Sequence, residues 1–133
     1  MSTIPLTRQS PAASEFYVVS GEPNDTPLEF RTKFGGSSLV GTWTIEIDNT
    51  LNADPSYLKL WWLPKGSVTI GATAPNAQFT AAGSTKQTYT FSSPMWMIPT
   101  TTVCTWACTS DAGTTGTTKP AATVSVRMLY RSA

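Results

Sequence analysis

Two cysteines, Cys104 and Cys108, are the first residues that could carry chemistry, because their CxxxC spacing suggests a metal or redox site. Both lie in an alternating run that predicts a strand over Thr101–Thr109. Four residues of a strand span about 13 Å, whereas the Cα atoms of a disulfide lie within about 7 Å. A structural zinc site needs four ligands, which a chain without histidine cannot easily supply. The spacing therefore predicts two buried, reduced thiols.

The acidic residues of the run DNTLNADPS, residues 48–56, form a second candidate site. Asp48 and Asp54 can share a calcium ion with Asn49 and Asn52, or act together as a glycosidase pair. The same residue types also make side-chain turns, and we favour that interpretation. The chain lacks histidine, the commonest general base, and has no nucleotide-binding or hydrolase motif. The sequence therefore predicts a protein that is not an enzyme, with no catalytic residue, metal or cofactor.

The five tryptophans are the remaining signal. Exposed aromatic rings stack on sugars, which makes a lectin-like carbohydrate-binding β-sandwich module the alternative function, whereas rings in a core need no ligand. Trp43 and Trp106 lie on the apolar faces of their strands and are predicted to be core. The pattern leaves Trp61 and Trp96 open between a subunit interface and an exposed groove.

Two runs at the centre of the chain are predicted to position these tryptophans. Residues Trp43–Asp48 alternate between apolar and polar, as in a half-buried strand. Residues Tyr57–Leu63 are apolar on both faces, with only Lys59 interrupting. A small sandwich readily covers one face of such a strand, so we expect a second layer or another protein molecule over Trp61. The candidate interface residues are Trp61, Tyr57, Leu63, Trp96, Met95 and Met97.

The rest of the chain predicts further strands and no helix. The run Met95–Ile98 lies between Pro94 and Pro99, so it can be a brief buried or edge segment but not the middle of a long strand. We expect the last two strands to pair as neighbours across the glycine-threonine loop Ser110–Pro120. The remaining strands are predicted at Glu15–Ser20, Leu28–Phe34, Ser67–Thr73, Lys86–Ser92 and Ala121–Arg131, with one further edge strand around Phe79.

This pattern predicts an all-β fold: a single-domain antiparallel β-sandwich or jelly roll of about eight short strands. We expect an extended N-terminal arm over residues 1–14 and the sandwich over residues 15–133. At 133 residues the chain is long enough to fold without disulfides or metals.

The charge content excludes an obvious electrostatic partner. Charged residues make up 13% of the chain, and its formal net charge is +1. The cations form no basic cluster, and no run is long enough to span a membrane, so we expect neither direct nucleic-acid contact nor a membrane partner. Nor does the N-terminus resemble an export signal. A surface low in charge is typical of a protein that packs against copies of itself or other proteins.

Two stretches resemble virion structural proteins. The run SYLKLWWLPKGSV, residues 56–68, is similar to the long strand with an apolar, proline-terminated end in small coat proteins of simple plant viruses such as tymoviruses. The closing run PAATVSVRMLYRSA, residues 120–133, resembles the terminal strand of such coats. The short chain without a basic arm resembles the head cement or decoration proteins of tailed bacteriophages instead. Either resemblance implies a capsid subunit in the virion that binds itself and other capsid subunits as a homo-oligomer, and the resemblance to cement proteins favours a trimer.

Overall fold

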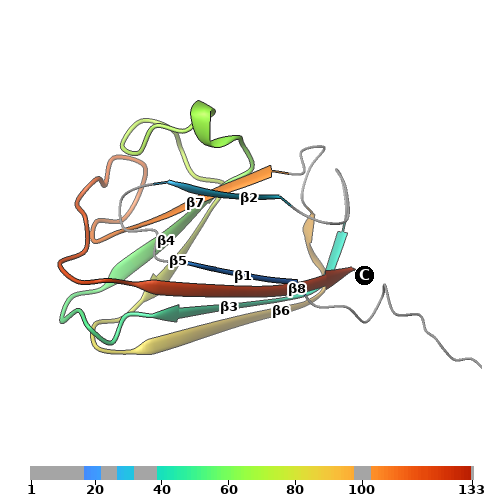
Figure 1. Cartoon of the computed structure of the whole chain (residues 1–133), viewed down its shortest axis with the longest axis horizontal. Helices are drawn as coiled ribbons and strands as arrows, with labels where there is room; N and C mark the ends of the chain where they lie inside the picture. The colour runs from blue at the N-terminus through green and yellow to red at the C-terminus, as the bar shows by residue number, and fades with distance from the viewer. Residues whose placement is uncertain (1–16, 22–26, 32–38, 98–102, 133) are drawn as a thin grey trace, which may run out of the picture.

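The computed structural model describes residues 17–21, 27–31, 39–97 and 103–132, which form two antiparallel four-stranded sheets packed face to face (Figure 1). The first sheet has the strand order β1-β8-β3-β6 and the second the order β2-β7-β4-β5. The predicted all-β sandwich is confirmed, and the expected arm at residues 1–14 lies outside the described residues. The strands are β1 Tyr17–Gly21, β2 Leu28–Arg31, β3 Leu39–Asp48, β4 Ser56–Trp61, β5 Ala77–Ala81, β6 Lys86–Met97, β7 Val103–Thr109 and β8 Ser125–Ser132.

The strand pairing is that of a jelly roll. β1 pairs with β8, β2 with β7, β3 with β6 and β4 with β5, as in a long antiparallel hairpin whose halves run side by side. Rolling this hairpin brings β8 against β3 and β7 against β4, which closes the two sheets. Between the two predicted alternatives, the strand order therefore identifies the jelly roll, an arrangement of two Greek keys.

The core lies between the sheets and follows the period-2 pattern of the strands. Alternate residues of each strand point inward, and burying them removes apolar surface from water. Phe79 and Tyr89 close the core beside the edge strands β5 and β6, with ring centroids 5.2 Å apart. The buried core residues are Ile45, Ile47, Leu58, Leu60, Phe79, Ala81, Cys104, Trp106, Cys108, Val124, Val126 and Met128.

The strand predicted at Ser67–Thr73 is wrong. The chain instead forms a short 3-10 helix, η2, at Lys65–Ser67, followed by turns. The amides of Ala72 and Thr73 both donate to the carbonyl of Thr69, and Gly71 has a φ of 96°, a conformation that L side chains rarely adopt. These turns make a compact loop over residues 62–76. No helix in the described part of the chain is long and apolar enough to cross a membrane.

The run after Pro94 forms the end of the long edge strand β6, which agrees with the predicted edge segment. β6 extends to Met97, and the register shifts so that Thr42 pairs with Ser92 but Val40 pairs with Trp96. The proline lies within this irregularity on an edge strand, where a missing N–H removes no bond to a second neighbour. A proline is therefore tolerated within β6 because it lies at a bulged edge.

The last two strands are not neighbours, which corrects the expected pairing. β7 pairs with β2 and β4 in one sheet, whereas β8 pairs with β1 and β3 in the other. Residues 110–124 carry the chain from one layer to the other. Consecutive strands are usually adjacent, but rolling a long hairpin separates them.

Candidate functional site

The strand β4 is buried on both faces, as predicted, and the chain itself supplies both covers. Trp61 is 1% exposed, and its indole Nε1 donates to the backbone carbonyl of Thr73, 3.0 Å away. Asn76 fastens the same loop, since its amide donates to the Leu60 carbonyl. In Figure 1 the loop that carries η2 lies on the outer side of β7 and β4. Of the two covers expected over Trp61, a second layer or another protein molecule, the loop of residues 62–76 supplies the first.

The other candidate interface residues lie at two places in the sandwich. Tyr57 and Leu63 are half-buried on the outer side of β4 and just beyond its end. The Leu63 carbonyl accepts a hydrogen bond of 2.7 Å from Thr105 Oγ1. Met95, Trp96 and Met97 belong to the end of β6, but their side chains are outside the described part of the structure. An interface at these five residues stays a prediction.

A buried lysine, which the sequence analysis missed as a feature, lies on the same outer face. Lys59 is 1% exposed, and its Nζ donates to the carbonyl of Gly116 at 3.0 Å. Removal from water lowers the pKa of Lys59, while the negative charge of Asp111 opposes that shift. The available signal was that Lys59 is the one charged residue in a strand predicted to be covered on both sides.

The loop over Lys59, residues 110–119, is built around Asp111. Its carboxylate accepts a bond of 3.1 Å from the Thr118 amide, and the Thr118 hydroxyl and amide hold the pKa of Asp111 below its usual value. A Cβ on Gly116 would lie 2.4 Å from the Asp111 carbonyl oxygen, so only glycine lets the loop close this tightly. The Gly113 amide donates to Gln78 Oε1 at 2.8 Å, which ties the loop to β5.

The turn interpretation of residues 48–56 is confirmed by a buried amide network. Asn49 is 0% exposed, and its Nδ2 donates to the carbonyls of Asp54, Ala81 and Ala82 at 2.9, 3.3 and 3.1 Å. Its Oδ1 accepts from Asn52 Nδ2 at 2.9 Å and from Ser56 Oγ at 2.8 Å. These bonds join the end of β3, the start of β4 and the end of β5.

Asp48, the first acid of the turn, makes local bonds through its side chain. The Oδ1 of Asp48 accepts from the Thr50 amide at 3.1 Å and from the Thr50 hydroxyl at 2.6 Å. The Thr50 hydroxyl, then its amide, lower the pKa of Asp48, and the positive charge of Lys86 acts in the same direction. Asp48, Asn49 and Asn52, three of the four residues proposed to share a calcium ion, therefore shape the turn through their side chains. The described residues contain no group of three or more acidic or cysteine side chains placed to bind a metal.

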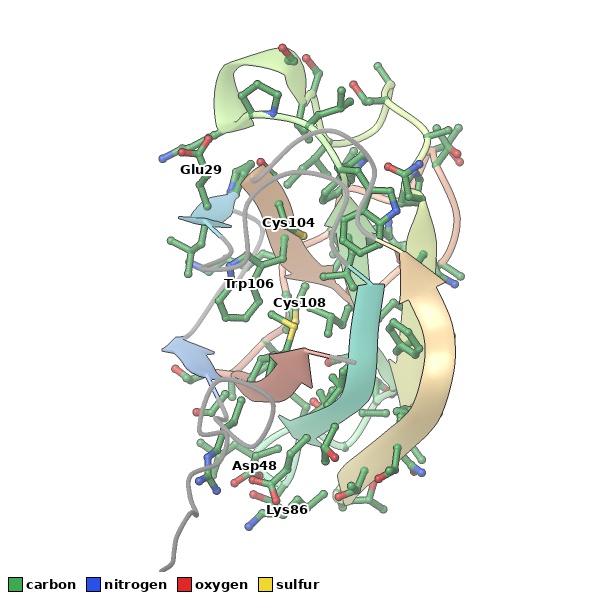
Figure 2. All side chains as sticks on the ribbon, turned by 90° about the vertical axis from the view of Figure 1, so that its right-hand side faces the viewer. Glu29, Asp48, Lys86, Cys104, Trp106 and Cys108 are labelled. Carbon is green, nitrogen blue, oxygen red and sulfur yellow. The ribbon has the colours of Figure 1, made fainter. Side chains whose placement is uncertain are left out.

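The two cysteines are buried free thiols, as predicted. Figure 2 shows Cys104, Trp106 and Cys108 on β7 in the space between the layers. Burial raises the pKa of Cys108 from 9.0 to about 12 and raises that of Cys104 still further. Thiols held in their neutral form are poor nucleophiles and poor metal ligands, so here they act as small apolar residues.

A pocket of about 320 Å³ opens at one end of the sandwich, between the turn of residues 51–56 and the loop that follows β7. Leu51 on its rim is 70% exposed. The charged side chains at the pocket are Asp54 and Lys119, both exposed. The lining residues are Leu51, Asn52, Ala53, Asp54, Pro55, Ser56, Ser110, Thr118, Lys119, Pro120 and Ala121.

The described tryptophans do not line this pocket. Trp61 and Trp106 are 1% and 2% exposed, and Trp62 is partly buried against the core. Trp106 Nε1 is a buried donor without a hydrogen-bond partner, which costs stability. The core position predicted for Trp106 is confirmed, whereas the side chains of Trp43 and Trp96 are outside the described part. The buried Trp61 and Trp106 therefore do not form an exposed aromatic groove of the kind that stacks on sugars.

No protein-family model and no curated protein matches this chain. Among solved structures, the chain is similar to a protein of the disulfide-linked pili of Bacillus endospore appendages, at 10% identity and a TM-score of 0.42 over 90% of this chain and 87% of the other. It is also similar to the coat protein of Tobacco streak virus, at 9% identity and a TM-score of 0.35 over 96% and 92% of the two chains. Scores this low do not bear on what the chain does.

Proposed function

We propose that this chain is a structural subunit that self-associates, and that it serves as a capsid shell or cement subunit of a virion. The observation that supports this is the rolled strand order β1-β8-β3-β6 over β2-β7-β4-β5. Jelly rolls form viral capsid domains, and also lectin and cupin domains, so the support is analogy at the level of the fold. The resemblance of residues 56–68 and 120–133 to coat and cement proteins points in the same direction.

The low charge content and an open strand edge suit a protein that binds other protein molecules. Charged residues make up 13% of the chain, and charged groups are depleted at the cores of protein interfaces. β6 is a 12-residue edge strand that pairs only with β3 among the described strands, so its other edge has backbone groups available for hydrogen bonds. The proposed partners are copies of the same chain and other capsid subunits.

Self-association is tested by light scattering on the purified chain over a wide concentration range. We expect concentration-dependent oligomers, with a trimer favoured. Apolar and backbone contacts are not weakened by ionic screening, so the association should persist from about 50 mM to about 1 M NaCl. A chain that stays monomeric at all concentrations and does not attach to a particle would contradict the proposal. Association lost between about 50 and 200 mM salt would instead indicate an electrostatic partner.

The virion assignment needs a separate test. Cryo-microscopy of a purified particle that contains the chain should place copies of it at symmetric positions in the shell or on its outer surface. Deletion of residues 1–14 should weaken attachment if the expected arm lies along a neighbouring subunit. Specific binding to a glycan array by a monomeric chain would favour the lectin-like alternative.

A further inference from the structure

The pocket at the end of the sandwich is held in shape by its own hydrogen bonds. The Asn52 Nδ2 donates to the carbonyl of Ala122 at 3.0 Å, and the Ala122 amide donates back to Asn52 Oδ1 at 2.7 Å. These reciprocal bonds join the turn before β4 to the segment before β8. The backbone at Ala53 also packs directly against Gly83, where a Cβ would lie 1.9 Å from the Ala53 carbonyl oxygen. A pocket fixed in this way loses little freedom when it binds a partner.

An apolar side chain is exposed beside this pocket. Leu51 is the large hydrophobic residue that the described part of the chain leaves exposed, at 70%. Single exposed leucines are common and need no explanation. Leu51 differs in that it lies beside a concave surface whose lining includes Pro55 and Pro120. The exposed Leu51 side chain and the pocket therefore lie on the same surface of the molecule.

Two opposite charges complete this surface. Asp54 and Lys119 both line the pocket, and the described residues make no ion pair or hydrogen bond to either charged group. The Asp54 carbonyl is bound by Asn49, so the position of its backbone is fixed. One unpaired acid and one unpaired base on a single patch suit a partner that presents the same two charges in reverse order.

We infer that a second copy of this chain docks at this pocket in a reciprocal, twofold contact. In an isologous contact residue i of one copy meets residue j of the other, and j meets i, so Asp54 of each copy faces Lys119 of its partner. The Leu51 side chain of each copy fills the pocket of the other. The inference rests on the proposed self-association, to which it adds one defined contact that can coexist with a threefold contact elsewhere. A sugar fits the pocket less well because no aromatic ring lines it.

The first experiment measures the dimerisation constant of the wild-type chain and of Leu51→Ser by sedimentation velocity. Burial of a leucine side chain contributes enough that its loss should weaken dimerisation at least about tenfold. Ala82→Ser, an exposed change outside the pocket lining, is the matched control and should leave the constant unchanged. Circular dichroism verifies that both variants are folded.

The second experiment reverses the charges one at a time. Asp54→Lys alone and Lys119→Asp alone each bring like charges together, so each variant should dimerise more weakly than wild type. An equimolar mixture of the two variants brings opposite charges together at both positions of the twofold contact and should recover dimers. The double variant Asp54→Lys/Lys119→Asp should recover them as well.

The outcomes separate this inference from the function proposed above. If the wild-type chain associates but neither Leu51→Ser nor the charge reversals change its association, the pocket contact is wrong and self-association stands. If the wild-type chain is monomeric, both fail. Recovery in the double variant without recovery in the mixture would also overturn the twofold arrangement.

Discussion

The two sheets share one architecture but differ in their outer faces. On β4 and β7 of the second sheet, the outward residues Lys59, Trp61 and Thr105 are 1%, 1% and 0% exposed. On β3, β6 and β8 of the first sheet, outward residues such as Glu46, Thr88 and Arg127 are half-buried or exposed. The difference comes from the loops, because residues 62–76 and 110–119 fold back over the second sheet and fasten there. A strand's exposure is therefore decided by its covering segments as well as by its own alternation.

The two faces also differ in how they satisfy polar groups. The open face of the first sheet can leave them to water, and its strands carry threonine, serine and charged residues there. The covered face must satisfy them within the chain, and Lys59, Trp61 and Thr105 each donate to a loop carbonyl. The same bonds that satisfy these donors also hold the loops down. Replacing outward residues on the two faces should thus have very different effects on stability.

The largest effect is expected from Trp61→Ala. It empties a fully packed site and removes the bond to Thr73, which should lower the free energy of unfolding by about 3–5 kcal/mol. Thr90→Ala, on the open face, is the matched control and should stay within about 0.5 kcal/mol of wild type. Urea denaturation measures both. A loss below about 1 kcal/mol for Trp61→Ala would mean that the loop does not cover this face in solution.

Asn49→Ala tests the buried amide network that joins the two sheets. It leaves buried carbonyls and the Asn52 and Ser56 donors without their partner, so the free energy of unfolding should fall by about 2–4 kcal/mol. Hydrogen exchange should then speed up in strands of both sheets, because the network connects β3 with β4 and β5. If exchange increased in the second sheet alone, the amide network would not couple the two sheets.

The thiols of β7 should make the protein less stable in alkali. Their pKa values are raised in the folded state, so the stability they contribute is present below about pH 9 and is lost as the pH rises toward 12. Each thiol accounts for about 1.4 kcal/mol per pH unit in that window. Cys104→Ala/Cys108→Ala should flatten the slope of unfolding free energy against pH by about 2–3 kcal/mol per unit. Equal slopes would mean that the thiols are reached by solvent.

The smallest effect is expected from replacing Lys59, the charged residue on the covered outer face of the second sheet. Lys59→Met fills a similar volume and removes the cost of burying an ammonium group, while the Gly116 carbonyl loses its donor. The free energy of unfolding should stay within about 1 kcal/mol of wild type or rise. Lys86→Met, on the exposed end of β6, serves as the control and should be neutral within about 0.5 kcal/mol. A loss of more than about 3 kcal/mol for Lys59→Met would show that the ammonium group itself holds the loop.

The sequence by itself determined most of the strands and the inward side of most of them. Period-2 alternation is a local property, so Trp106 and the two cysteines were assigned to the core from their neighbours alone. Part of the turn at residues 48–56 was also local, because Asp48 bonds to Thr50 and Asn49 bonds to the Asp54 carbonyl. Such features need no knowledge of which strands meet.

Only the tertiary structure decided which strands pair and which outer face is covered. The separation of β7 from β8 follows from rolling the whole hairpin, and no short run encodes it. The apolar residues of 67–73 have a strand-like pattern, yet they belong to a loop whose partner, Trp61, lies outside the run. The burial of Lys59 likewise depends on Gly116, which is 57 positions away along the chain. Contacts over such separations depend on the closed fold, and local patterns carry no information about them.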